Sequence, residues 1–337
     1  MRRLLIVILI ITVSLEVFAQ QRRDFTQIYR NAPYINPGFA GIEEFLEINA
    51  GAQQSWAGSD ANQASFFASA YGRIGYNNPV VYEQNSLRTS EPLMYRKMAR
   101  TRKEVYRKHG IGGRISSVSI GPLIQQMVTL TYAYHLPLST DLRLSFGTNL
   151  AFNRQQVNLQ NYTVRNEDDD LFFQELMRQG DGSSNSFDAG FGAVLYGDKF
   201  FAGISARSLF SAEMSNSLQV ESLDPVTMYS FMGGMEFVMG EYFTLRPGLK
   251  ADYSEAVGLV VQPNVSVRFK DALSMGVYYQ FDRAVSVVMG IQLTDGLRLG
   301  YSYDHFTADL SLLNQNNHEI TITFFVNNKY GLSSYLW

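Results

Sequence analysis

Apolar and polar residues alternate with a period of two along most of the chain after residue 45. In the segment 142–152 the even-numbered positions are mostly apolar, whereas the odd-numbered positions are small or polar. The same alternation recurs at 273–281, 285–293, 297–303 and 320–326. Successive side chains of a β-strand point to opposite faces of the sheet, so the pattern predicts strands with one apolar and one polar face.

The length of these segments points to a membrane. Each spans about ten residues, which a tilted strand needs to cross the hydrocarbon core, whereas strands of soluble proteins average about 5–6 residues. Alternation alone would also fit a soluble sandwich with one wet face. Aromatic residues gather near the segment ends, as in the interface girdles of outer-membrane proteins. We therefore predict an all-β fold, a transmembrane antiparallel β-barrel.

Counting the alternating segments gives fourteen strands, with twelve as the alternative count. The predicted strands cover residues 45–56, 62–74, 109–120, 125–136, 140–154, 186–197, 199–211, 227–239, 241–253, 256–269, 271–282, 284–294, 296–306 and 317–327. Turns after even-numbered strands are mostly tight, whereas the long connections 155–185 and 212–226 follow odd-numbered strands. Barrels of this class have short periplasmic turns and longer outer loops, which orients the predicted barrel.

In this register several charged side chains share the face opposite to the apolar one. Charges on the lipid face are costly at mid-membrane, so we expect these residues to face the lumen. A polar interior of internal ion pairs is favoured over a track for a substrate. The set comprises Arg143, Arg207, Glu236, Arg246, Lys250, Asp252, Arg268, Arg298 and Asp304.

The chain ends divide the protein further. Residues 1–19 combine Arg2 and Arg3 with the apolar run 4–13 and a small residue at Ala19, which predicts a cleaved secretory signal peptide. Residues 20–44 precede the barrel, 45–327, and would form a periplasmic or plug segment or a simple lead-in to the first strand. Residues 328–337 form a C-terminal tail.

Composition excludes several function classes. The chain of 337 residues has no Cys and a formal net charge of -3, which removes thiol chemistry and gives no reason to expect nucleic-acid binding. Its four His residues are scattered and form no zinc motif, and no phosphate loop or Gly-x-Ser-x-Gly elbow is present. We therefore expect a protein that is not an enzyme, with no catalytic residue, metal site or cofactor.

The segment 31–41, NAPYINPGFAG, resembles the entry motif N-P-x-Y-I-N-P-A-Y-A-G of the PorP/SprF family. The chain departs from that motif at Ala32, Gly38 and Phe39. Further similarities follow in the family's order at 54–58, 132–138, 142–147, 196–199, 202–205, 292–304 and 318–320. Each motif is weak by itself, but together they run collinearly along almost the whole mature chain.

The resemblance implies an integral outer-membrane component of the type IX secretion and gliding-motility system. Such a protein would bind one secreted or surface cargo, such as an adhesin with a C-terminal targeting domain. It would couple that cargo to the translocon and to a peptidoglycan-associated lipoprotein, while outer-membrane lipid surrounds the barrel. The alternative is a passive porin or a FadL-like transporter of small or hydrophobic molecules; an outer-membrane lipase is a weaker third reading.

Three segments are candidates for binding partners. The insert 75–108 is longer than the family's connection, and within it residues 88–108 carry eight basic and two acidic side chains, a net charge of +6. The loop 155–185 carries six acidic and two basic side chains, a net charge of -4. Both fit a solvated loop as well as a docking surface. The candidate residues are Tyr34, Asn36 and Pro37 of the N-terminal segment, Arg96, Lys97, Arg100, Arg102 and Lys103 of the insert, and Asp168, Asp169 and Asp170 of the loop.

Overall fold

A computed structural model gives the fold of the chain. It describes residues 25–55, 63–74, 107–120, 123–157, 183–216, 226–281, 283–307 and 316–328. The strands are β1 (Leu46–Ser55), β2 (Gln63–Ile74), β3 (Lys108–Ile120), β4 (Leu123–Pro137), β5 (Leu142–Val157), β6 (Ser183–Gly197), β7 (Phe200–Asn216), β8 (Met228–Met235), β9 (Phe237–Met239), β10 (Phe243–Ser254), β11 (Gly258–Phe269), β12 (Leu273–Gln280), β13 (Ala284–Thr294), β14 (Leu297–Phe306) and β15 (Asn316–Val326).

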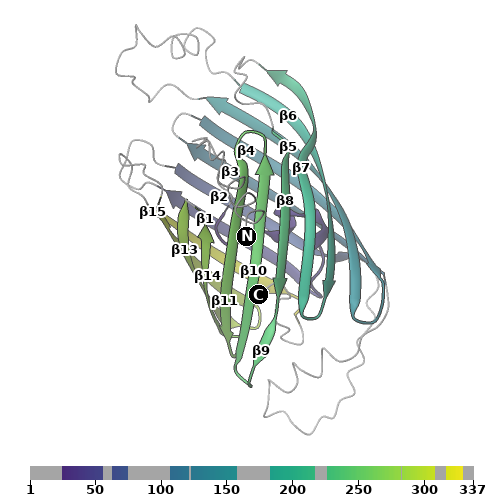
Figure 1. Ribbon diagram of the computed structural model, residues 1–337. Helices are drawn as coiled ribbons and strands as arrows, with labels where there is room; N and C mark the ends of the chain where they lie inside the picture. The colour runs from purple at the N-terminus through teal and green to yellow at the C-terminus, as the bar shows by residue number, and fades with distance from the viewer. Residues whose placement is uncertain are drawn as a thin grey trace, which may run out of the picture.

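All fifteen strands belong to one antiparallel sheet that closes on itself (Figure 1). The last strand, β15, pairs with β1, and β10 pairs with β11, which completes the ring. Because β8 and β9 both pair with β10, they occupy one position in the wall, and the barrel has fourteen positions. The predicted antiparallel barrel of about fourteen strands is confirmed.

The eighth predicted strand, 227–239, is interrupted in the structure. β8 ends at Met235 and β9 begins at Phe237, while the register against β10 is unchanged: Gly248 lies opposite Gly234 and Leu245 opposite Phe237. Pro247 of β10 lies at the interruption and has no N–H to donate to a ladder. The strand therefore stops for two residue pairs and resumes in the same register.

The two faces of the wall differ as the alternation predicts. Large apolar side chains point outward, and Leu150, near the middle of β5, is 62% exposed. Polar side chains such as Asn49, Thr129 and Ser145 point inward and are buried. Hydrocarbon surrounds the outside of such a barrel and the inside is polar, so this arrangement suits a membrane-spanning wall.

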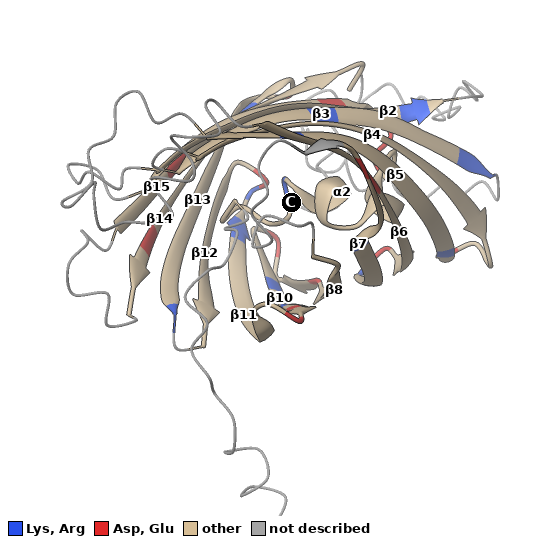
Figure 2. Cartoon of the chain, turned by 90° about the horizontal axis from the view of Figure 1, so that it is seen from above, with Lys and Arg blue, Asp and Glu red and all other residues tan. Residues whose placement is uncertain are grey.

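Two short helices lie inside the ring of strands rather than in the wall. They are α2 (Ala32–Ile35) and the 3-10 helix η1 (Pro37–Phe39), and the view along the barrel shows α2 within the ring (Figure 2). Helix η1 packs against β4, β5 and β6. Among the described residues, no helix is both long enough and apolar enough to cross a bilayer.

Candidate functional site

The described part of the N-terminal segment, residues 25–45, runs through the lumen from one end of the barrel to the other. Thr26 contacts Asp304 and Glu319, close to the connection between β14 and β15. Glu44 contacts Arg73 and Lys108, where β2 ends and β3 begins. We call the first end the loop end and the second the turn end, and we call residues 25–45 the luminal segment.

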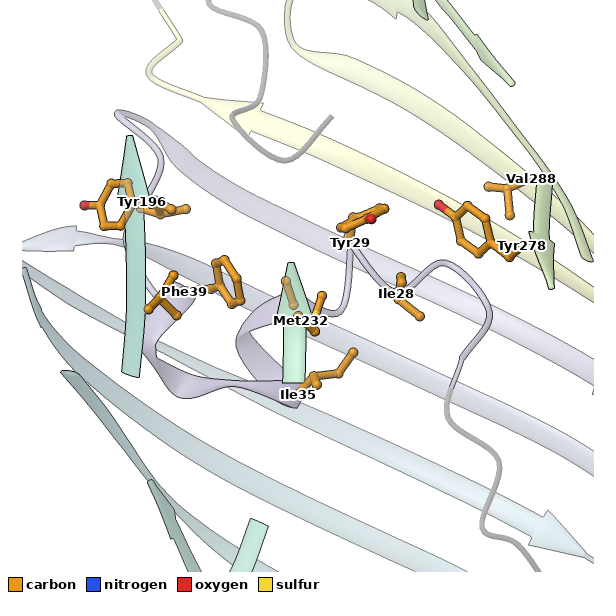
Figure 3. Packing of buried hydrophobic residues seen from close by; sticks show 11 residues of the cluster. Ile28, Tyr29, Ile35, Phe39, Tyr196, Met232, Tyr278 and Val288 are labelled. Carbon is orange, nitrogen blue, oxygen red and sulfur yellow. The ribbon is translucent and has the colours of Figure 1, made fainter. Parts of the chain in front are cut away.

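The largest buried apolar cluster lies between the luminal segment and the wall (Figure 3). Its members from the segment are Ile28, Tyr29, Ala32, Ile35, Phe39 and Ile42, and its members from the wall are Val194, Tyr196, Met232, Tyr278 and Val288. Phe201 meets Phe39 and Tyr29 edge-on at centroid distances of 5.5 and 6.0 Å, a favoured aromatic geometry. Burial of apolar surface thus holds the segment within an otherwise polar lumen.

Asn36 fixes the turn between the two helices and joins it to the wall. Its side-chain oxygen accepts from the Gly38 N–H at 2.9 Å, which caps η1. Its amide nitrogen donates to the carbonyls of Ala193 and Ile204 at 3.1 and 2.9 Å. Pro37 at the first position of η1 has the backbone angle that a helix start requires. The sequence Asn-Pro therefore makes both the local turn and its attachment.

Glycines on the inner wall provide the space that the luminal segment occupies. A side chain at Gly192 or Gly203 would collide with the Asn36 amide, and one at Gly147 would collide with the Pro37–Gly38 backbone. A side chain at Gly110 would collide with the backbone at Ala40. Glycine inside a strand commonly marks such a close approach of another backbone. Glycines within the predicted strands could therefore have indicated that another part of the chain packs against the inner wall, which apolar–polar alternation does not reveal.

Hydrogen bonds attach the segment on many sides of the ring. Arg30 donates to Thr323 at 2.7 Å, Tyr29 to Asn264 at 2.6 Å, and Ser205 to the Ile35 carbonyl at 2.8 Å. Ser145 donates to the Gly38 carbonyl at 2.7 Å. Buried polar groups are costly when unpaired, and these bonds pair such groups of the wall with such groups of the segment. The attachments reach β5, β7, β11 and β15, which lie far apart around the barrel.

His135 of β4 adds an attachment near the turn end. One ring nitrogen, Nε2, lies 2.8 Å from the Ala40 carbonyl, and the other, Nδ1, lies 2.8 Å from the Tyr196 hydroxyl. A carbonyl can only accept, so Nε2 carries the proton and Nδ1 accepts from Tyr196. The neutral imidazole therefore links β4 and β6 to the luminal segment.

Tyr34 lies between two guanidinium groups of the wall. The Arg114 and Arg207 guanidinium carbons lie 4.4 and 4.8 Å from the centre of its ring. Arg114 also donates to the Asn31 side chain and lies 4.3 Å from the Phe67 ring. Stacking on aromatic faces compensates buried Arg for lost hydration. Tyr34 therefore joins β3 and β7 across the lumen.

At the turn end, the luminal segment is held by charge. The Glu44 carboxylate forms ion pairs with Lys108 and Arg73, and its side chain is about a third exposed (35%). Burial by itself would raise the pKa of Glu44, but the charges of Lys108 and Arg73 outweigh burial, and the net effect is a lowered pKa. The carboxylate is thus the favoured form where the segment enters β1.

The charges predicted to face the lumen do so, and several are paired. Arg246 bonds Glu236, Lys250 lies 2.6 Å from Asp252, and Arg268 lies 2.7 Å from Asp271. Glu236 also lies 3.7 Å from Arg268. A pocket beside these pairs is bounded by Tyr29, Phe201 and Pro247. Mixed-sign pairing is the arrangement that the alternation pattern implied.

The predicted partner-binding residues fall into two groups. Asn36 and Pro37 are buried and Tyr34 is half-buried, and all three contact the wall from inside. The basic residues Arg96, Lys97, Arg100, Arg102 and Lys103 and the acidic residues Asp168, Asp169 and Asp170 lie outside the described residues. The structure brings the first three residues together, in the lumen.

Several solved structures are similar to this chain at low sequence identity. The toluene transporter TbuX of Ralstonia pickettii matches at 9% identity and a TM-score of 0.47, over 88% of this chain and 93% of that chain. The outer membrane protein Omp33 of Acinetobacter baumannii matches at 9% identity and a TM-score of 0.44, over 85% and 99%. At these values the likeness carries no argument about function.

The family comparison is more specific. No curated protein matches the sequence. A family model described as "Type IX secretion system membrane protein PorP/SprF" matches residues 17–324, which is most of the chain and nearly all of the barrel. Together with the closed barrel and its apolar outer face, this match identifies an integral outer-membrane protein. The chain belongs to the PorP/SprF family of type IX secretion system membrane proteins.

Proposed function

We propose that this protein is a filled, non-conducting scaffold of the type IX secretion system. It binds a dedicated secreted protein at its outer loops and couples that protein to the periplasmic machinery. The observation that supports this proposal most directly is the luminal segment, which occupies the lumen and is attached to strands on many sides of the ring. A barrel filled in this way serves better as a docking platform than as a passage.

Two charged segments are the proposed contact surfaces. The acidic loop 155–185 follows β5 at the loop end, and the basic insert 75–108 follows β2 at the turn end. Charge complementarity steers encounters between proteins, so surfaces of opposite sign at opposite ends suit two different partners. The cargo, with its C-terminal targeting domain, meets the acidic loop. The translocon and its peptidoglycan-associated lipoprotein meet the basic insert.

The experiment is affinity isolation of the tagged full chain from mild-detergent outer membranes after crosslinking, with mass spectrometry. Wild type should recover one large secreted protein together with secretion components. Changing Asp168, Asp169 and Asp170 to Asn should lose the secreted protein alone. Changing Arg96, Lys97, Arg100, Arg102 and Lys103 to Gln should lose the periplasmic components alone. Each variant serves as the control for the other.

Recovery of the barrel alone from crosslinked wild-type membranes would contradict the scaffold. The rival function, a porin or a transporter of small or hydrophobic molecules, needs a passage through the lumen. Planar-bilayer recordings of the purified protein distinguish the two functions. Steady ohmic conductance by the wild type would favour the porin, whereas a scaffold stays closed.

A further inference from the structure

Six polar side chains of three neighbouring strands form a patch on the inner wall at the loop end. In the register of the sheet, Glu319 of β15 lies between Ser302 of β14 and Gln53 of β1. Two residue pairs closer to the loop end, on the same face, Asn317 lies between Asp304 and Ser55. All six are at most 5% exposed. The patch is therefore a buried, oxygen-rich part of the lumen wall.

Three oxygens in the first row have no hydrogen-bond partner among the described residues. They are Glu319 Oε1, Ser302 Oγ and Gln53 Oε1. Directly opposite residues of antiparallel strands have Cβ atoms about 4.5–5.5 Å apart, so these three side chains are immediate neighbours on one face. Buried polar atoms are nearly always satisfied in proteins. Three such oxygens side by side form a set of ligands that one bound cation would satisfy together.

The second row adds the carboxylate of Asp304, and Thr26 of the luminal segment links this carboxylate to that of Glu319. Thr26 donates its N–H to Glu319 Oε2 and its hydroxyl to Asp304 Oδ2, both at 2.6 Å. Asn317 donates to the same Asp304 oxygen, and Ser55 donates to Asn317. The guanidinium of Arg30 bonds to Thr323 and the Leu299 carbonyl, and its charge also acts on Glu319. Two buried carboxylates thus lie together, and like charges so close repel each other.

We propose that Glu319, Gln53 and Ser302, with Asp304 beside them, bind one calcium ion that secures the start of the luminal segment. Calcium accepts carboxylate, amide-carbonyl and water oxygens in flexible geometry, which suits donors from three strands. The ion neutralises the two carboxylates, and these carboxylates in turn hold Thr26. Barrels of this class have short periplasmic turns and longer outer loops, which places the loop end outside the cell. Calcium would enter there from the medium.

The test is calcium binding by the full chain, refolded in detergent without lipopolysaccharide and freed of metal with EDTA. Equilibrium dialysis against radioactive calcium should give one ion per chain, and calcium should raise the thermal unfolding midpoint. Glu319→Gln should weaken binding by at least about tenfold, since even outer-shell changes cost that much at metal sites. Ser302→Ala should weaken it less.

Asp188→Asn is the matched control, because Asp188 is another inward-facing carboxylate of 5% exposure that accepts from Ser211 in a separate part of the wall. It should bind calcium as the wild type does. The proposal fails if metal-free wild type binds no calcium, or if Glu319→Gln binds it equally well. If calcium has no effect and Glu319→Gln matches the wild type in thermal stability, a proton on Glu319 satisfies the patch instead.

Discussion

At the scale of single residues, the attachments of the luminal segment come from side chains that serve two purposes at once. Asn36 caps its own helix and donates to two wall carbonyls. His135 joins two strands and the Ala40 carbonyl. A buried group with several partners leaves several partners unsatisfied when it is removed. Substitution of Asn36, which belongs to the segment itself, should therefore loosen the segment while the strand ladders of the wall stay intact.

Asn36→Ala tests this expectation. The change removes three hydrogen bonds of a side chain that is buried, and the loss should cost about 1–3 kcal/mol of local stability. Hydrogen exchange of the amides in residues 26–42 should accelerate, while exchange in β4 to β7 should stay slow. Asn153→Ala is the control: Asn153 is equally buried but bonds Gln125 within the wall. Equal acceleration in both variants would contradict the expectation.

The ion pairs of Glu44 predict a dependence on pH. The pKa of Glu44 in the folded protein lies below its ordinary value of 4.5. Its contribution is therefore complete above about pH 4.5 and disappears as the pH falls through the lower, folded-state pKa. Protease cleavage of the luminal segment should increase on acidification below that range in wild type. Glu44→Gln should show elevated cleavage already at neutral pH, with a smaller further change. A wild-type profile that matches that of Glu44→Gln would contradict the role of these pairs.

At the scale of elements, the luminal segment depends on the glycines of the wall for its position. The barrel strands are held by their own ladders, so a glycine that faces the segment can be changed without breaking a strand. The segment, by contrast, has only two helical turns of its own. Its position is therefore decided by the shape of the surrounding wall.

Gly147→Ala should displace the segment. The added methyl group would collide with the Pro37–Gly38 backbone, and overpacking of this kind typically costs about 1–3 kcal/mol. Exchange at residues 37–41 should accelerate, and openings should occur in planar-bilayer recordings. Gly296→Ala is the control, because a methyl group there meets its nearest atom at 3.6 Å, an ordinary contact. Unchanged exchange at residues 37–41 in Gly147→Ala would refute the proposed fit.

At the scale of the whole molecule, the outer face determines where the barrel resides. Leu150→Arg places a charge near the middle of β5, where an exposed Arg costs about 2–4 kcal/mol in a bilayer. Leu138→Arg makes the same change on an exposed side chain in the turn between β4 and β5, where the cost is about 0–1 kcal/mol. Urea unfolding in lipid vesicles should separate the two. Equal destabilisation would argue that the middle of β5 does not lie in the hydrocarbon core.

The sequence predicted the wall better than its contents. Alternation of apolar and polar residues was enough to place the strands, because one face of each strand contacts lipid and the other faces the polar lumen. The break at Glu236 was missed because it depends on Pro247, which is adjacent only across the ladder. For residues 20–44 the sequence left a plug and a lead-in open. The contacts of residues 25–44 come from side chains of strands between β2 and β15, a set that no local pattern can identify.

The route of the luminal segment also constrains how the molecule assembles. Thr26 and Arg30 are among the first described residues, yet they bond to Glu319 and Thr323, 293 positions later in the chain. Contacts of such long range form slowly, after the intervening chain is in place. The inner wall at this point exists only once β15 has paired with β1. The segment can therefore acquire its final contacts only when the ring closes around it. A filled lumen thus marks a completed barrel. In a chain truncated before β15, the first part of the luminal segment would have no wall to bind.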